Sequence, residues 1–450
     1  MDTFIQIAQI IFILSILVVL HEFGHFIPAK IFKVKVEKFY LFMDAGFSLF
    51  KKKIKDTEWG IGWLPIGGYV KLAGMIDESM DTEQLKQEPQ PWEFRSKPAW
   101  QRLIIMLGGI TVNIILAWFL YTAVYSTYGQ KYIATDKFQE NGLSFGDVGK
   151  SAGFQNGDKI VSVDGEFQEK YNRMIIDILL GTEVVVNRNG ENKTILLTDE
   201  NKRDILKKEG RNFIGPRIKN IIVDSINPKS GAQKMGLKIG DRIVGINGKS
   251  TPYFDVLSDE LKSHKNDSIT LSIIRNNEKL TLATKTDKEG KIGFGYSKQA
   301  EKEFNTYEIV NKMSFIDAIP KAVEESYTQF VYNIKQFKLL LKPKTEAYKQ
   351  VKSPIGITRQ LPTEWDWEFI WKFTAMFSIG LAFMNLLPIP GLDGGHALFT
   401  IAEMITGRTL SEKAMGYVQT GGMIFLLSLM ALTFGKDIYE IIIDNFFKKV

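Results

Sequence analysis

The chain has 450 residues, and its 57 Lys and Arg against 51 Asp and Glu give a formal net charge of +6. The length allows roughly three domains, and the absence of cysteine excludes disulfides, thiolate metal ligands and a cysteine nucleophile. The mean hydropathy of −0.06 is ordinary, but it averages long uncharged runs with strongly charged stretches. No basic stretch is interleaved with aromatic residues, so we expect no nucleic-acid partner.

Four runs are apolar and long enough to cross a bilayer, which takes roughly 20 residues. The first covers residues 3–20 and the second residues 103–126, and neither carries a charge. The third covers residues 373–389 and follows three tryptophans that suit a membrane interface. The fourth covers residues 414–435. We therefore expect a polytopic α-helical membrane protein with four spans in contact with lipid.

Flanking cations predict the orientation of these spans. Lysines and arginines gather after the first run and before the second, whereas only Asp2 precedes the first run. We therefore expect the segment between the first two spans to be cytoplasmic and the N-terminus to lie outside. Alternation of the spans then places residues 129–369 on the outer face of the membrane.

The first run continues into the motif HEFGH at residues 21–25. His21 and His25 are four residues apart, so on a helix both imidazoles face one side and can bind one metal ion. Zinc suits two neutral imidazoles plus one carboxylate oxygen, with a fourth position for water. Glu22 lies beside that face, where it can accept a proton from the water. The alternative is a polar cluster that caps a helix at the bilayer boundary. A charged glutamate is costly to keep there without a use, which argues against this alternative.

A third metal ligand should lie near the same face of the membrane. The third run ends in NLLPIPGLDGGH, residues 385–396, and the expected orientation places this end on the cytoplasmic side as well. The prolines break the helix and Gly394 and Gly395 allow close backbone approach, so we expect Asp393 to complete a site for one zinc ion. The simpler alternative is a turn or helix-capping aspartate. His396 is the other candidate ligand, and we expect it to pack beside the ligands or support them.

HExxH on the first span, combined with NxxPxPxLDG on a later span, resembles the site-2 proteases, a family of intramembrane zinc metallopeptidases. The resemblance covers most of the chain and is greatest to the bacterial branch. It implies that His21, His25 and Asp393 bind zinc and that Glu22 is the catalytic base. It also implies that Asn385 engages the substrate or the oxyanion, whereas contact between helices is the alternative.

The same resemblance extends to the second span and to the biological role. The family usually carries Gly-Pro-x-x-Asn in this span, and here residues 109–113 are GITVN, with isoleucine in place of proline. Asn113 remains a candidate contact near the site. The family also implies a location in the bacterial inner membrane. Its substrates would be single-span membrane proteins, such as anti-sigma factors already cut by an upstream site-1 protease, or leftover signal peptides.

Short strands are predicted between the first two spans at residues 46–50 and 59–64, followed at residues 65–72 by a turn that enters another short strand. They indicate a cytoplasmic β-hairpin element over residues 46–75. A peptide bond inside a helix must unwind before cleavage, and an edge strand can pair with the unwound chain. We therefore expect Gly68, Tyr69 and Val70 to clamp an extended substrate. The alternative is an amphipathic hairpin resting on lipid.

A repeat lies between the second and third runs. The sequence GFQNGDKIVSVDG, residues 153–165, recurs as GLKIGDRIVGING, residues 236–248, which indicates two copies of one small domain. Both resemble the core of PDZ domains in bacterial envelope proteases. We place two small β-rich PDZ-like domains at 131–215 and 216–300, inserted between spans two and three. They would either filter substrates by size or bind a peptide tail.

Two helical halves then flank the inserted domains. Residues 1–130 would form the N-terminal half of the membrane core, residues 301–365 an amphipathic connector, and residues 366–450 the C-terminal half. The connector would lie on the outer membrane surface or pack beneath the PDZ-like pair. The function that these features favour is a zinc endopeptidase. A membrane-anchored PDZ scaffold with a vestigial metal site is the alternative, and the intact Glu22 argues against it.

Overall fold

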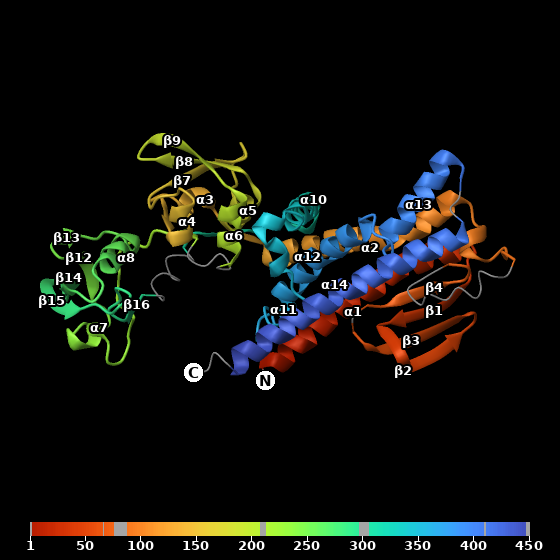
Figure 1. Ribbon diagram of the computed structural model, residues 1–450, viewed down its shortest axis with the longest axis horizontal. Coiled ribbons are helices and arrows are strands. Elements are labelled where there is room, and N and C mark those ends of the chain that lie inside the picture. Colours follow the sequence, from red (N-terminus) through yellow and green to blue (C-terminus); the bar gives the residue numbers. More distant parts are fainter. Residues whose placement is uncertain are drawn as a thin grey trace. The chain divides into compact units, whose positions relative to one another are not determined.

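The structure is a computed structural model that describes residues 2–65, 67–75, 88–207, 213–296, 306–408 and 411–446. The chain divides into two compact units. The helical unit comprises Met1–Gly129, Lys312–Phe337 and Val351–Val450, and the repeat unit comprises Gln130–Asn311 and Lys338–Gln350. Long helices dominate the first unit, whereas the second consists of small sheets and short helices (Figure 1).

Among the described residues, four helices are long and apolar enough to cross a membrane. Three of them extend beyond the expected runs at both ends, and α1 passes without a break through the HEFGH motif. The third begins before its expected run, 373–389, but ends three residues short of it, at Leu386. The third of these helices ends before Pro388, because a proline cannot continue a helix, and Asp366 caps its start by accepting a hydrogen bond from the Phe369 N–H. The four helices are α1 (Asp2–Ile31), α2 (Ala99–Tyr128), α12 (Trp367–Leu386) and α14 (Glu412–Phe446).

Helix α2 is the centre of the helical unit, since α1, α12 and α13 (Asp393–Thr406) all pack against it. Gly24 of α1 and Gly108 of α2 permit a very close approach, because a Cβ added to either would overlap the backbone of the other. The α1–α12 contact is apolar and includes Ile13, Leu17 and Ile370. This packing fixes the position of the HEFGH motif against α2.

A four-stranded sheet follows α1, in the order β2-β3-β1-β4. Strand β1 pairs in parallel with β3 and antiparallel with β4, which is an edge strand next to α1. The expected hairpin was therefore too small, because the additional strand β1 turns it into a mixed sheet. The bounds are β1 (Val36–Leu41), β2 (Met43–Ile54), β3 (Thr57–Leu64) and β4 (Tyr69–Leu72).

The expected amphipathic connector forms α10 (Phe315–Leu340). Its Ala318 and Ala322 are buried in a cluster with Tyr121 of α2 and Ala375 of α12. The first part of α10 therefore packs on the long helices of the helical unit. The remaining short elements of this unit are η2 (Phe94–Ser96) and α11 (Pro354–Thr358).

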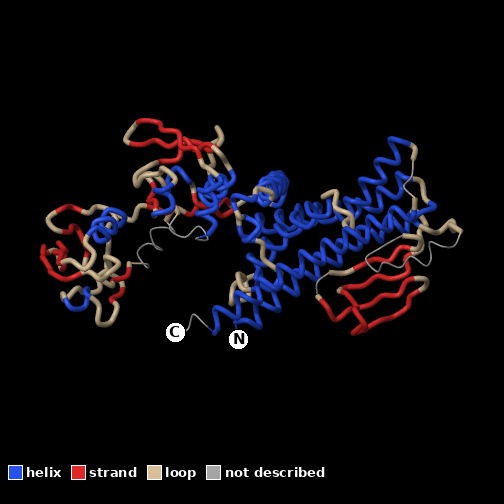
Figure 2. The backbone as a smooth tube through the Cα atoms, in the orientation of Figure 1, coloured by secondary structure: helices blue, strands red, loops and turns tan. Residues whose placement is uncertain are grey.

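The repeat unit contains two copies of one arrangement, in which short helices lie beside a small sheet (Figure 2). Each copy has its own apolar core. The first copy and its flanks contain β5 (Gln130–Ile133), α3 (Thr135–Phe138), β6 (Leu143–Phe145), α4 (Asp147–Ser151), β7 (Lys159–Val163), α5 (Tyr171–Leu180), β8 (Glu183–Arg188), β9 (Glu191–Leu196), α6 (Asp199–Lys207) and β10 (Ile214–Pro216). The second copy and its flanks contain β11 (Ser225–Ile226), α7 (Gly231–Lys234), β12 (Arg242–Ile246), β13 (Lys249–Ser250), α8 (Phe254–Ser263), β14 (Ser268–Arg275), β15 (Glu278–Lys285), β16 (Phe294–Gly295), β17 (Glu308–Asn311), η3 (Pro343–Thr345) and η4 (Ala347–Gln350).

A buried ion pair occurs in the same place in both copies. In the first, Arg188 donates to both carboxylate oxygens of Asp158 at 2.8 Å and to the Gly153 carbonyl oxygen at 2.9 Å. In the second, Arg275 donates to Asp241 at 2.7 and 2.6 Å and to the Gly236 carbonyl oxygen at 2.8 Å. The two aspartates belong to the repeated Gly-Asp pair of the sequence. Matching polar contacts therefore accompany the matching sequences.

Candidate active site

Three side chains from distant parts of the sequence converge at the centre of the helical unit. The Nε2 atoms of His21 and His25 each lie 3.3 Å from Oδ2 of Asp393, and 3.4 Å from each other. These three residues form a group, within the described part of the chain, that could hold a metal ion. The two imidazoles come from successive turns of α1, and the carboxylate is at the start of α13.

The chain between α12 and α13 turns sharply to deliver Asp393. Gly391 has a φ of +98°, in the left-handed region that glycine adopts without strain. Gly395 follows within a turn of the helix, and a Cβ there would lie 2.5 Å from the Ile389 carbonyl oxygen. Glycine is therefore required at both positions for this path of the backbone.

Hydrogen bonds orient both imidazole rings. His25 Nδ1 lies 2.8 Å from the Ile105 carbonyl oxygen of α2. Because a carbonyl only accepts, Nδ1 carries the proton and Nε2 keeps its lone pair for the site. His21 Nδ1 lies 3.0 Å from the carboxamide of Asn113, whose backbone carbonyl accepts a hydrogen bond from Ser378 at 2.7 Å. Gly109 leaves room for both rings, since a Cβ there would lie 2.6 Å from His21 Cε1.

The hydrogen bonding of two buried oxygen atoms indicates whether these residues fit a metal ion. Oδ2 of Asp393 and Oδ1 of Asn113 have no hydrogen-bond partner among the described residues. A metal ion between the three side chains would satisfy the Asp393 oxygen. If His21 Nε2 binds that ion, its Nδ1 carries a proton, and a half-turn of the Asn113 carboxamide brings Oδ1 to accept it. Two imidazoles plus one carboxylate, with the rest of the shell open, fit a catalytic zinc ion.

Glu22 and the edge strand β4 line the same cavity, which has a volume of about 310 Å³. The Glu22 carboxylate is buried and accepts a hydrogen bond from the backbone N–H of Val70. Tyr69 and Gly68 also line this cavity. A Cβ on Gly68 would lie 2.5 Å from Cγ1 of Val18 and 2.6 Å from the Tyr40 carbonyl oxygen, so only glycine lets the strand pass so close to α1.

Asn385 and His396 also line this cavity. Nδ2 of Asn385 lies 3.2 Å from His21 Nε2, so its carboxamide reaches the point where the three side chains meet. His396 lies one turn after Asp393 on α13. Its Nε2 is buried and has no hydrogen-bond partner among the described residues, and His396 lies outside the His-His-Asp group.

Sequence reasoning missed the groups that support the site. The Ile105 carbonyl and the Val70 N–H are backbone groups, which no residue type reveals. Ser378 is a small polar residue in an apolar run, and only its contact with the backbone of Asn113 distinguishes it from other serines. Its position toward α2 could have been found only from the packing of α12.

Comparisons with known proteins agree with this geometry. The model for peptidase family M50 matches residues 9–429. A Vibrio cholerae protein named "Putative zinc metalloprotease" is 30% identical, over 94% of this chain and 96% of its own. The regulator of sigma-E protease RseP of Escherichia coli is 26% identical, over 96% and 98% of the two chains. The regulator of sigma E protease of Haemophilus influenzae has the same identity and coverage.

The chain belongs to peptidase family M50. The predicted family and the prediction of a metalloprotease are thereby confirmed. Zinc is the metal in the name of the Vibrio relative. The match begins inside α1 and ends inside α14, so the M50 region contains both halves of the helical unit and the inserted repeat unit.

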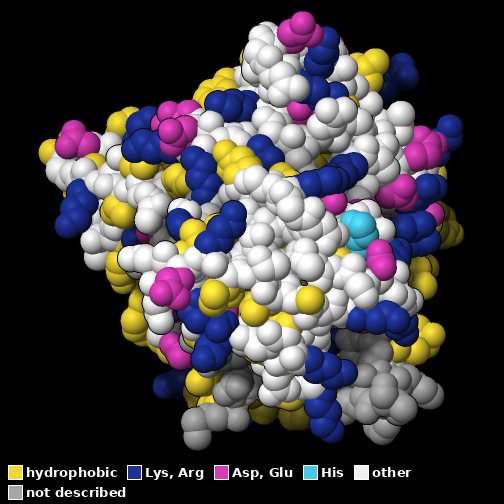
Figure 3. Space-filling model, turned by 90° about the vertical axis from the view of Figure 1, so that its left-hand side faces the viewer, with side chains coloured by type: hydrophobic (Ala, Val, Ile, Leu, Met, Phe, Trp, Pro, Cys, Tyr) yellow, Lys and Arg dark blue, Asp and Glu magenta, His cyan; other side chains and the backbone are white. Residues whose placement is uncertain are grey.

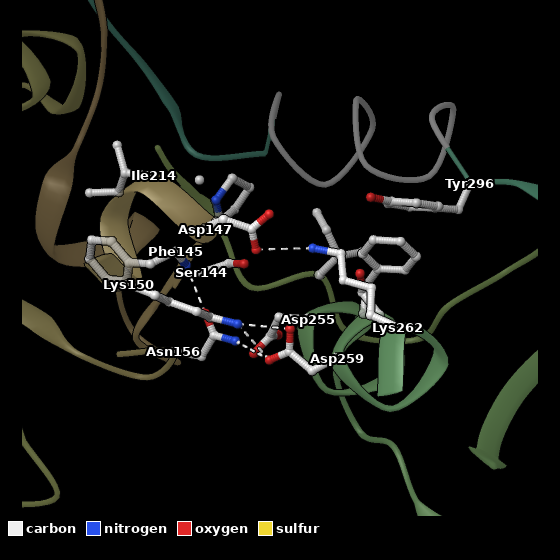
Figure 4. A pocket seen from close by; sticks show the side chains of 16 residues that line it. Ser144, Phe145, Asp147, Lys150, Asn156, Ile214, Asp255, Asp259, Lys262 and Tyr296 are labelled. Carbon is white, nitrogen blue, oxygen red and sulfur yellow. Dashed lines mark hydrogen bonds and ion pairs between the residues drawn. The ribbon is translucent and has the colours of Figure 1, made fainter. Parts of the chain in front are cut away.

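The inserted repeat unit of this M50 chain holds a second cavity, of about 600 Å³, lined by residues of both copies. Figure 4 shows Lys150 and Asp259 pointing toward each other, with Nζ and Oδ2 2.6 Å apart, and Lys262 pairs with Asp147 at 3.3 Å. Burial raises the pKa of Tyr296, which also lines this cavity, to about 12, so its hydroxyl stays protonated at neutral pH.

One face of the M50 chain carries charges of both signs on its surface. Figure 3 shows the side of the molecule on which β14 and β15 lie in Figure 1. Lys and Arg side chains are interspersed there with Asp and Glu rather than gathered in one patch. This face therefore presents no large field of a single sign.

Proposed function

We propose that this M50 protein is a zinc-dependent intramembrane endopeptidase that cuts single-span membrane proteins. The observation that carries the proposal is the convergence of His21, His25 and Asp393 beside Glu22, since α1, which holds both histidines and Glu22, is long enough to cross a bilayer. Family membership and the names of the relatives support the same chemistry. In this assignment the three converging residues bind one zinc ion per chain.

The remaining residues then have distinct roles. When bound, zinc supplies a Lewis acid that polarises the scissile carbonyl and acidifies the attacking water. Glu22, oriented by the Val70 N–H, accepts the proton of that water and passes it to the leaving amine. His21 Nε2 cannot bind zinc and accept a hydrogen bond from Asn385 at the same time. The Asn385 amide is therefore free to donate to the developing oxyanion.

The edge strand β4 is the proposed clamp for the substrate. A peptide bond can reach the site only after its helix has unwound, and an extended chain needs partners for its backbone groups. Strand β4 pairs with β1 on one side, while Tyr69 and Val70 line the cavity. Pairing of the substrate with the edge of β4 that does not face β1 would satisfy those groups next to Glu22. Proline at Val70 should abolish cleavage and leave the zinc content unchanged.

The two copies of the repeat unit are proposed to be PDZ-like domains at 131–215 and 216–300. We favour a role as a size filter, which admits only substrates whose outer domain has been removed. Deletion of residues 131–300 separates this role from tail binding. A filter predicts cleavage of intact substrates by the deletion variant, whereas a required tail sensor predicts loss of cleavage.

The cellular setting is proposed from the relatives and from the flanking cations. Relatives named regulator of sigma-E protease support a role in a proteolytic cascade. Substrates would then be membrane proteins such as anti-sigma factors, cut after an upstream site-1 protease. The distribution of lysines and arginines favours a bacterial inner-membrane location, with the site toward the cytoplasm and the repeat unit outside.

Zinc content and cleavage, measured on the same purified full-length protein, test the proposal. Glu22→Gln should retain zinc and lose cleavage of a model single-span substrate by about 10²–10⁴-fold. The matched control is Glu324→Gln, the same change at an exposed carboxylate of α10, which should cleave like the wild type. Equal activity of Glu22→Gln and wild type would remove Glu22 as the base. A scaffold with a vestigial site predicts that the wild type does not cleave.

A further inference from the structure

A buried amide interrupts the apolar helix α14. The Gln419 side chain is only 4% exposed, whereas Tyr417, Ile424 and Phe425 nearby are 56–79% exposed. A polar group buried in a helix that can cross a bilayer is costly unless it has a partner. Among the described residues, none forms a hydrogen bond or an ion pair with Gln419, whose side chain lines a cavity. The amide is therefore open to a partner that enters this cavity.

The geometry of α14 turns Gln419 toward the active site. Gly422 and Met423 follow three and four residues later, on the same face of the helix. Gly422 packs on Pro390, where a Cβ would overlap the proline carbonyl, and the Met423 nitrogen lies 3.4 Å from the Cβ position of Gly391. This face of α14 therefore covers the turn that delivers Asp393.

Gln419 also lines the 310 Å³ cavity that contains Glu22, Val70 and Asn385. The other carboxamide of this cavity, that of Asn385, already has a role in the proposed function, because its amide donates to the developing oxyanion. The Tyr69 hydroxyl, which belongs to the same wall, donates to Asp44 at 3.0 Å. Gln419 thus brings an uncommitted donor and an uncommitted acceptor to the cavity.

We propose that Gln419 binds the backbone of the unwound substrate, with its carboxamide paired to a peptide group of the extended chain. A carboxamide offers the same donor and acceptor as a peptide unit, so this contact is independent of substrate side chains. Together with the edge of β4, it holds the substrate from a second element of the cavity wall. The inference rests on the proposed endopeptidase function and adds a binding residue on α14.

A binding measurement without turnover tests this role. In the zinc-loaded full-length protein with Glu22→Gln, the additional change Gln419→Leu should weaken binding of a fluorescent model single-span substrate about tenfold. Zinc content and thermal unfolding should stay unchanged. The control is Thr420→Val, a polar-to-apolar change at the exposed neighbouring position, which should bind like the parent. If Gln419→Leu does not fold, Gln419→Met replaces the amide with a side chain of similar length.

Ester substitution in the substrate locates the contact. Replacing one backbone amide at a time by an ester, on both sides of the scissile bond, removes one N–H per substrate. One ester should weaken binding to the parent but cause no further loss with Gln419→Leu. Unchanged affinity of the folded variant, or equal penalties in both proteins at every ester, would overturn the inference. Cleavage by Glu22→Gln alone would instead overturn the proposed function, so the two failures are distinguishable.

Discussion

Asp158 and Asp241 of the repeat unit differ from Asp393 of the helical unit in how their carboxylates are paired. In the repeat unit, Asp158 and Asp241 each receive two hydrogen bonds from an arginine, and a backbone N–H donates to each as well. In the helical unit, Oδ2 of Asp393 lacks a hydrogen-bond partner among the described residues, although two imidazole nitrogens lie 3.3 Å away. The first arrangement is complete without a ligand, and the second is not.

This difference separates structural from functional polar groups. A complete network of hydrogen bonds stabilises a fold, and it occurs twice in the repeat unit because the domain occurs twice. An incomplete network is costly, so its presence at the centre of packed helices indicates a ligand that completes it. The unpartnered Oδ1 of Asn113, next to His21, belongs to the same incomplete network.

Removing the charge of Asp393 should produce the largest effect. Asp393→Asn should reduce bound zinc from about one per chain to less than about 0.1, because zinc prefers the charged carboxylate. The helices should remain folded, since no hydrogen bond of the fold depends on Oδ2. Metal analysis and circular dichroism of the purified protein check both parts. Full zinc content in Asp393→Asn would make this aspartate structural.

Removing the hydrogen-bond partner of His21 should have a smaller effect on zinc binding. Asn113→Leu preserves the volume of the side chain but removes the acceptor for the His21 Nδ1 proton. Zinc affinity should fall about 10–100-fold, as measured by competition with a chelator. Thr111→Val, on the exposed side of the same helix, is the control and should bind zinc normally. An unchanged affinity in Asn113→Leu would contradict the proposed half-turn of the carboxamide.

Disrupting the complete hydrogen-bond network of Asp241 should lower the stability of the repeat unit and leave zinc binding unchanged. Arg275→Leu leaves the buried Asp241 without its guanidinium, which should lower the stability of the second copy. Hydrogen exchange of the full-length protein, followed in β12 and β14, measures this loss. Lys249→Leu breaks an exposed pair with Glu260 and should change little. Reduced zinc content in Arg275→Leu would contradict the distinction between a structural Asp241 and a metal-binding Asp393.

Acid should produce the smallest effect, and one source of it is Asp241 in the second copy. Burial opposes ionisation of Asp241, but hydrogen bonds from Arg275 and the Lys238 N–H outweigh it and lower its pKa below the ordinary 3.8. This carboxylate therefore stabilises the fold above that pH, and the stabilisation is lost as the pH falls through the lower folded-state value. Protection of β12 should decline in that range in the wild type. The decline should be weaker in Arg275→Leu, and an equal decline would exclude Asp241 as its source.

Much of this arrangement could be predicted from sequence, because it depends on local spacing. The i, i+4 spacing of His21 and His25 sets their common face, and the prolines before Asp393 set the end of α12. The repeat was visible because both copies keep the same Gly-Asp pair. These features require only neighbouring residues.

The rest depends on contacts that are distant in sequence. Strand β1 was missed because its pairing with β3 and β4 is nonlocal and its residues include two charges, Glu37 and Lys38. The contacts of His25 with Ile105 and of Glu22 with Val70 involve backbone groups. Gln419 was visible as a polar residue in an apolar run, but its direction is set by the packing of Gly422 on Pro390.

The most direct test of the central claim is X-ray absorption at the zinc edge of the purified, zinc-loaded protein. The account predicts two imidazole nitrogens at about 2.0–2.1 Å, with oxygen ligands at about 2.0–2.2 Å. His25→Ala should then lose one imidazole from the spectrum or lose the zinc. A shell without imidazole, or a spectrum that His25→Ala leaves unchanged, would contradict it.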